Sequence, residues 1–121
     1  NPVSCRAALA TLDLIEREYL ANTVQRGKQL KAGLTELAAH NASMANVRGL
    51  GLMLAVDVIG NDGQLAPDRR GAIIQAAFQH GLLLLGCGKS SIRFCPPLCV
   101  TEEEVRIALD LLAQACTTAG E

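Results

Sequence analysis

Aromatic residues are scarce in this chain of 121 residues, which has two Phe, one Tyr and no Trp. The core must therefore be built from aliphatic side chains. Neither sign of charge is in excess, because 11 Lys and Arg stand against 12 Asp and Glu. Without a basic surface or an aromatic platform, no nucleic-acid partner is expected. No hydrophobic run reaches membrane-spanning length and no signal peptide is visible, so no membrane partner is expected.

The five cysteines lack the spacing of a metal site. Cys95 and Cys99 are separated by two prolines and have no second pair, and neither His40 nor His80 stands at a zinc-ligand spacing. The odd count and scattered positions do not suggest a disulfide framework. We interpret the cysteines as reduced, mostly small apolar fillers in a cytoplasmic protein, and expect no metal.

The hydrophobic pattern predicts one domain of helices and short strands. Helices are expected over about residues 2–20, 23–39, 67–80 and 101–116, and strands over about 47–58, 82–85 and 91–95. Thr101 followed by three glutamates has the pattern of a capping box. The expected fold is α/β (α+β), a small, mostly antiparallel sheet of three or four strands with helices packed on one face.

One arginine stands out in the last predicted strand. Arg93 lies between Ile92 and Phe94, and Pro96-Pro97 follows at once, so the strand must end there or run at an edge. The guanidinium fork of an arginine suits a carboxylate or a phosphate. Because neighbours in a strand alternate faces, the pattern alone favours the simpler interpretation of a solvated side chain. Asp57, at the end of another predicted strand, is also most simply solvated.

A glycine-rich loop invites a nucleotide-binding interpretation that its context does not support. Gly88-Lys89-Ser90 matches the end of a phosphate-binding loop, but Leu83 stands where that loop needs its first glycine. A strand and two prolines follow the loop instead of a helix. Lys89 would be reactive only if it were desolvated. We do not expect this loop to bind a nucleotide.

Three segments carry a more specific pattern. They are Asn1–Leu12, where Asn-Pro opens an alanine-rich helix, then Val47–Leu54 with its two glycines, and then Gly81–Leu84 with Ile92–Leu98 and Thr101–Glu104. In this order they resemble the carboxy-terminal part of class III aminotransferases. These pyridoxal-phosphate enzymes include 4-aminobutyrate, ornithine and acetylornithine aminotransferases.

The resemblance implies that residues 1–121 are the smaller carboxy-terminal domain of a fold-type I aminotransferase, without its cofactor-binding large domain. The family moves an amino group from an amine or amino acid to a 2-oxo acid, uses pyridoxal 5'-phosphate and forms homodimers. The arginine of its Arg-x-x-Pro-Pro pattern, here Arg93, binds a substrate carboxylate. The family's catalytic lysine lies upstream of the Asn-Pro helix. The resemblance therefore implies no catalytic or cofactor-binding residue in this chain, and an isolated chain that binds no cofactor and is inactive.

An alternative is a non-enzymatic α/β module that binds a small molecule or another protein. Such a module has the same helix-and-strand pattern and needs no catalytic residue. The chain begins at Asn1 and enters a helical pattern at once, which we interpret as a piece of a longer protein. The sequence upstream of Asn1 in the native gene would separate the two hypotheses. Neither hypothesis identifies the amino donor and acceptor.

Overall fold

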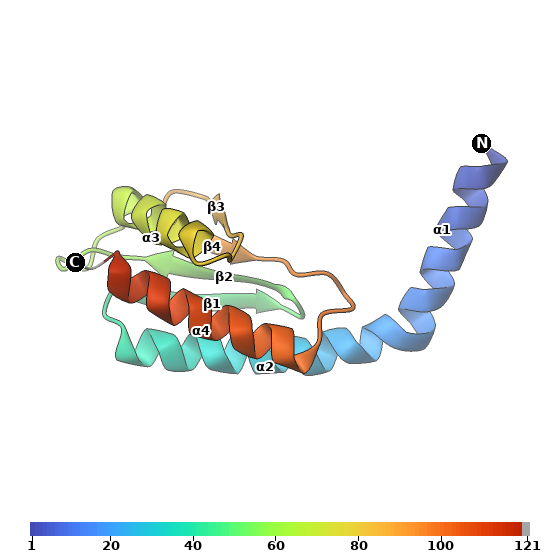
Figure 1. The fold of residues 1–121 in the computed structure, drawn as a ribbon, viewed down its shortest axis with the longest axis horizontal. Coiled ribbons are helices and arrows are strands. Elements are labelled where there is room, and N and C mark those ends of the chain that lie inside the picture. Colours follow the sequence, from blue (N-terminus) through green and yellow to red (C-terminus); the bar gives the residue numbers. More distant parts are fainter. Residues whose placement is uncertain (120–121) are drawn as a thin grey trace.

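The computed structural model describes residues 1–119 and has a helical arm joined to an α/β body (Figure 1). The elements in order are α1 (Pro2–Leu14), the π-helical turn η1 (Ile15–Tyr19), α2 (Leu20–His40), β1 (Met44–Leu50), β2 (Met53–Val58), α3 (Pro67–Gln79), β3 (Leu85–Cys87), β4 (Ser91–Phe94) and α4 (Glu102–Thr118). The strands form one sheet in the order β1-β2-β4-β3, and every neighbouring pair is antiparallel. The expected fold class is confirmed.

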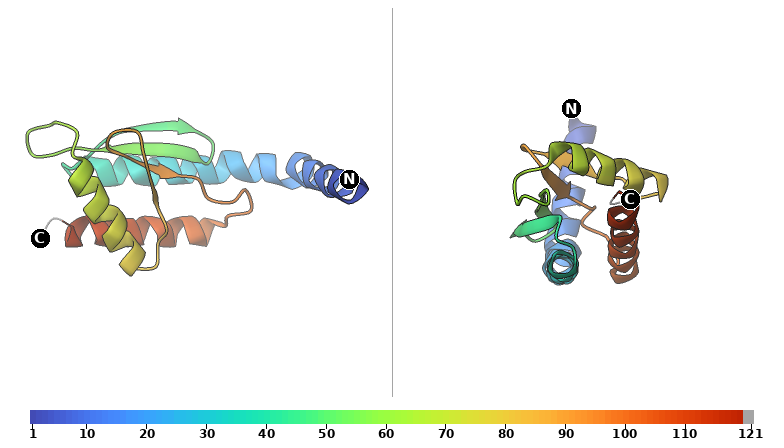
Figure 2. Two further views of the ribbon diagram at one scale, coloured as in Figure 1. Left: turned by 90° about the horizontal axis from the view of Figure 1, so that it is seen from above. Right: turned by 90° about the vertical axis from the view of Figure 1, so that its left-hand side faces the viewer.

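The sheet has one face covered by helices and one open face. The side chains of β2 and β4 that point toward the helices are buried, namely Leu54, Val56, Val58, Ile92 and Phe94. Helices α2 and α3 pack against this covered face, and α4 lies against both of them (Figure 2). The helices complete the core with Leu34, Ile73 and Leu112, which have no exposed surface. The core is aliphatic, as the composition requires.

The capping box predicted at the start of α4 is present. The Thr101 hydroxyl accepts a hydrogen bond from the Glu104 backbone N–H at 3.2 Å, and the Glu104 carboxylate accepts one from the Thr101 N–H at 2.8 Å. Such a cap stabilises a helix by about 1 kcal/mol. The cap fixes where the loop after β4 ends and α4 begins.

The break predicted between the first two helices is wrong. Residues 2–40 form one continuous helical segment, in which η1 adds an extra residue to one turn. Asn22, placed in the expected gap, instead donates side-chain hydrogen bonds to the carbonyl oxygens of Leu98 and Val100, at 2.7 and 3.0 Å. These bonds tie α2 to the loop that follows β4.

The strand predicted over residues 47–58 is also wrong as a single element, because it is a hairpin. Strand β1 begins at Met44, and the last pair before the turn is Leu50 with Met53. Gly51, in the turn, has a φ of 55°, a conformation that favours glycine. The apolar run hid this turn, because Leu50 and Met53 continue the hydrophobic pattern through it.

The strand predicted over residues 82–85, which its run of four leucines also marks as buried, is displaced. Strand β3 covers Leu85–Cys87, and Cys87 pairs with Ser91 across a three-residue loop that has Gly88 at a φ of 53°. The loop therefore sets the register, as it does in short hairpins. Of the four consecutive leucines, Leu83 and Leu85 are exposed, to 80% and 58% of their surface. The hydrophobic run alone therefore misplaced the strand, and the expectation that these leucines are buried is wrong for Leu83 and Leu85.

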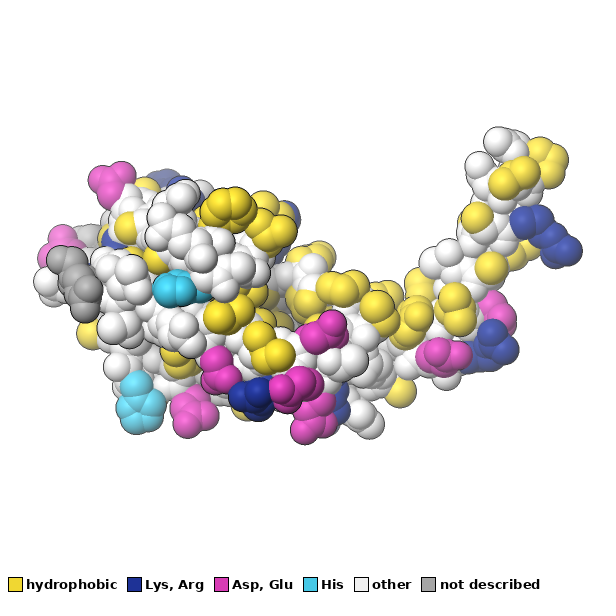
Figure 3. Space-filling model, viewed as in Figure 1, with side chains coloured by type: hydrophobic (Ala, Val, Ile, Leu, Met, Phe, Trp, Pro, Cys, Tyr) yellow, Lys and Arg dark blue, Asp and Glu magenta, His cyan; other side chains and the backbone are white. Residues whose placement is uncertain are grey.

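Helix α1 extends away from the sheet as an arm (Figure 1). All of its residues are exposed, and within residues 1–119 the only element that it contacts closely is η1. Hydrophobic side chains are visible along the arm and the start of α2 (Figure 3). The exposed large hydrophobic residues of these segments include Val3, Leu9, Leu12 and Leu20. None of the helices over residues 1–119 combines the length and hydrophobicity that a membrane span needs.

Candidate functional site

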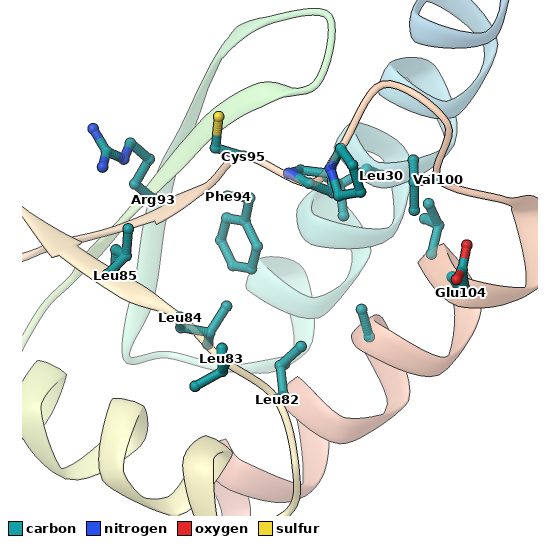
Figure 4. A pocket seen from close by; sticks show the side chains of 14 residues that line it. Leu30, Leu82, Leu83, Leu84, Leu85, Arg93, Phe94, Cys95, Val100 and Glu104 are labelled. Atoms are coloured by element: carbon teal, nitrogen blue, oxygen red, sulfur yellow. The ribbon is translucent and has the colours of Figure 1, made fainter.

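Arg93 projects from the open face of the sheet. It lies on the central strand β4, opposite Ala55 of β2 and Leu85 of β3. Figure 4 shows Arg93 and its neighbour Phe94 on opposite sides of β4, with Phe94 directed into the body. Over residues 1–119, no hydrogen bond or ion pair engages the Arg93 guanidinium. Its donors are therefore available to an anion.

Two hollows meet at Arg93. One, of about 330 Å³, has a mostly apolar lining from α2, from the chain that leads into β3, from the end of β4 and the loop after it, and from α4 (Figure 4). Its lining residues are Leu30, Leu82–Leu85, Phe94–Pro97, Val100, Glu104, Val105 and Ala108. The other, of about 670 Å³, is lined by Arg48–Leu50, Met53–Ala55 and Cys87. A cation beside an apolar wall suits a ligand with one carboxylate and an aliphatic chain.

A second group of polar side chains lies on the same open face. Arg48 of β1 forms an ion pair with Asp57 of β2, with 2.7 Å between Nη1 and Oδ1. The Ser91 hydroxyl donates a hydrogen bond to the same Asp57 oxygen and accepts one from Arg48 Nη2 at 3.0 Å. Asn46 Nδ2 donates to Asp57 Oδ2 at 2.8 Å. Asp57 is therefore fully engaged, and the simple prediction of a solvated carboxylate is wrong.

A bulge in β1 directs two of these groups at Asp57. Ala45 pairs with Asp57 and Arg48 pairs with Ala55, so that two residues of β1 lie opposite one residue of β2. Asn46, in the bulge, has a φ of 52°, which asparagine tolerates better than most residues. Only the register of the sheet brings Asn46, Arg48 and Ser91 together, and therefore no sequence motif indicated this group.

The group makes stability dependent on pH. Burial alone would raise the pKa of the Asp57 carboxyl, but hydrogen bonds from Ser91, Asn46 and Arg48 outweigh burial and leave this pKa below its usual value. A carboxyl whose pKa is lowered by folding stabilises the fold above its unfolded pKa, and this stabilisation is lost as the pH falls through the folded pKa. The stabilisation that Asp57 provides is therefore lost at pH values below about 4.

Replacing Asp57 with asparagine should remove this pH dependence. At pH 7 we expect the Asp57→Asn variant to be less stable than the wild type by about 0.5–1 kcal/mol, because Arg48 is 44% exposed and the pair is partly screened. At pH 3 the difference should be smaller. Urea denaturation at both pH values measures it. A difference that stays constant or grows toward pH 3 would contradict the assigned role of the carboxylate.

The lysines of this chain do not form a cofactor site. Lys28, Lys31 and Lys89 are all exposed, and none of them lines either hollow beside Arg93. A pyridoxal-phosphate site needs a lysine amine to form the Schiff base. The residues described here therefore do not fit that group. Over residues 1–119, no cluster of three or more His, Cys, Asp or Glu side chains forms a metal site.

Comparisons with known proteins identify the family to which this chain is similar. The family model described as "Aminotransferase class-III" matches residues 1–116. Acetylornithine aminotransferase of Nostoc sp. is 40% identical over 120 residues, covering 98% of this chain and 27% of that protein. 4-Aminobutyrate aminotransferase GabT of Escherichia coli is 33% identical over 119 residues, covering 94% and 28%.

The solved structures show the same fold. A phospholyase from Arthrobacter, in complex with phosphoethanolamine, superposes with a TM-score of 0.92 at 28% identity, covering 98% of this chain and 29% of that one. The chain thus spans little more than a quarter of the length of these relatives. Because the family model matches nearly all of the sequence, the chain belongs to the class-III aminotransferase family.

Proposed function

We propose that the protein containing this chain transfers an amino group between an amine or amino acid and a 2-oxo acid, and that Arg93 binds the substrate carboxylate. Membership of the class-III aminotransferase family supports the reaction. The single observation that supports the role of Arg93 is its guanidinium on the open face of the sheet, which no residue over 1–119 engages. The homodimer and the cytoplasmic location stay predictions.

The chemistry of Arg93 fits this role. A guanidinium donates two parallel hydrogen bonds to a carboxylate, which fixes orientation as well as position. The apolar hollow beside it can receive the aliphatic part of the same molecule. The family implies pyridoxal phosphate in the whole protein, where the cofactor supplies the electron sink for the reaction. Holding the substrate at its carboxylate limits the positions in which its amine can react.

The test is an Arg93→Lys variant of the full-length gene product. Lysine keeps the charge but loses the bidentate geometry, so we expect a loss of about 1–3 kcal/mol in the binding of carboxylate substrates. Steady-state kinetics with several amino acids and 2-oxo acids measures this loss as an increase in KM. An amine substrate without a carboxylate should be much less affected.

Arg106→Lys is the matched control, because Arg106 is an exposed arginine on α4 that pairs with Glu103 and Asp110, away from both hollows beside Arg93. It should leave the kinetics unchanged. Unaltered kinetics of Arg93→Lys with every carboxylate substrate would contradict the role of Arg93. No amino transfer by the full-length product, with any amine and 2-oxo acid tried, would favour the non-enzymatic module.

A further inference from the structure

The four strands carry three charged residues, and all of them lie on the open face. They are Arg48 on β1, Asp57 on β2 and Arg93 on β4. Ala55 of β2 pairs with Arg48 on one side and with Arg93 on the other. Asp57 is two residues from Ala55 on the same face, and is therefore a diagonal neighbour of both arginines. Diagonal neighbours lie about 7–8 Å apart, within reach of a long side chain.

Contacts from both neighbouring strands, β1 and β4, hold this carboxylate in a position where it does not pair with Arg93. Asp57 Oδ1 accepts from Arg48 and from Ser91, and Oδ2 accepts from Asn46. Ser91 also accepts a hydrogen bond from Arg48, which closes the group. The Asp57 side chain is only 16% exposed, and it forms no hydrogen bond or ion pair with Arg93. One arginine is thus neutralised and the other is left free, although the register offers the same carboxylate to both.

We infer that Arg48 is a positioning residue that holds Asp57 away from Arg93 and so keeps the substrate-binding arginine free. The inference rests on the proposed function of Arg93. Without Arg48, Asp57 would keep its negative charge, and Arg93 would be the only cation left in the sheet. An Asp57–Arg93 pair would occupy the donors that a substrate carboxylate needs. Asp57 would then be an internal competitor of the substrate.

Replacing Arg48 with methionine tests this inference in the full-length holoenzyme. Methionine keeps much of the length of the side chain and removes its charge. We expect the Arg48→Met variant to raise KM for carboxylate substrates by about two- to fivefold, the range of a partly exposed ion pair, with little change in kcat. Adding Asp57→Asn to the same protein removes the competitor and should restore KM to near the wild-type value.

Two further variants separate competition from damage to the fold. Arg106→Met removes two ion pairs from α4, with distances of 2.6 and 2.8 Å, and should leave KM unchanged. Asn46→Gly suits the positive φ at this position and removes only the bond to Asp57 Oδ2. It should raise KM for carboxylate substrates, but by less than Arg48→Met does. It tests the same inference if Arg48→Met does not fold.

The outcomes separate this inference from the proposed function. If the double variant binds carboxylates as poorly as Arg48→Met alone, or if neither Arg48→Met nor Asn46→Gly raises KM, Arg48 does not protect Arg93 and the inference is wrong. If Arg93→Lys leaves the kinetics unchanged, the proposed function itself fails. A rise in KM on Arg48→Met, reversed by Asp57→Asn while Arg93→Lys stays impaired, supports both.

Discussion

Replacing Gly27 with alanine should destabilise the protein, although alanine is the better helix former. A Cβ atom at this buried position of α2 would lie 2.5 Å from the carbonyl oxygen of Gly51, in the turn between β1 and β2. Backbone atoms cannot move aside as a flexible side chain does, so the helix and the hairpin must separate. We expect the Gly27→Ala variant to lose about 1–3 kcal/mol of unfolding free energy, as is usual for overpacking.

Gly71 provides the matched control. It also lies inside a helix, α3, but a Cβ atom there would meet nothing within 4 Å. The Gly71→Ala variant should therefore gain about 0.5–1 kcal/mol from the lower conformational entropy of the unfolded chain. Urea denaturation of both variants measures the two effects. If Gly27→Ala were as stable as Gly71→Ala, the close approach of α2 to the hairpin turn would not exist in solution.

The close approach at Gly27 matters for the site because the hairpin carries Arg48. Thr23 and Gly27, one helical turn apart on α2, both lie against Gly51 in the hairpin turn. A helix pushed away from this turn would shift β1, and with it the bulge that directs Asn46 and Arg48 at Asp57. The position of a helix glycine and the arrangement of charges on the far face of the sheet are thus connected through one strand.

The sequence predicted those features that depend on local chemistry. The capping box at Thr101 and Glu104 is a pattern of neighbouring residues, and it is present as predicted. The antiparallel sheet with helices on one face follows from the order and spacing of apolar segments. The carboxylate-binding role of Arg93 stays a prediction from a family pattern of adjacent residues, and the structure places this arginine on the open face of the sheet.

The features that the sequence did not predict depend on register. From the sequence, Asp57 is expected to be a solvated carboxylate. In the structure, the sheet brings Arg48, Asn46 and Ser91 to it from two other strands. A shift of one residue would turn each of these side chains to the other face. The register is set by the turn at Gly51 and by the loop that begins at Gly88. The loop was recognised from its glycines, but the turn at Gly51 was hidden by the apolar residues around it.

Among these variants, the largest loss of stability is expected on replacing Ile92, a core residue adjacent in sequence to Arg93. Ile92 has no exposed surface and lies on β4 between Ser91 and Arg93, so the strand places it in the core and its two neighbours on the open face. Truncation to alanine should lower the unfolding free energy by about 2–5 kcal/mol, through lost burial and the cavity that remains. Urea denaturation measures this loss.

Ile107 of α4 is the matched control, because it is 43% exposed and loses the same atoms on truncation. Ile107→Ala should cost less than about 1 kcal/mol, since little buried surface is lost and alanine favours the helix. Equal losses in the two variants would mean that β4 is not packed against the helices as described. If Ile92→Ala instead loses stability as expected, the same packing that buries Ile92 also fixes the direction in which Ser91 and Arg93 point, because adjacent residues of a strand face opposite ways.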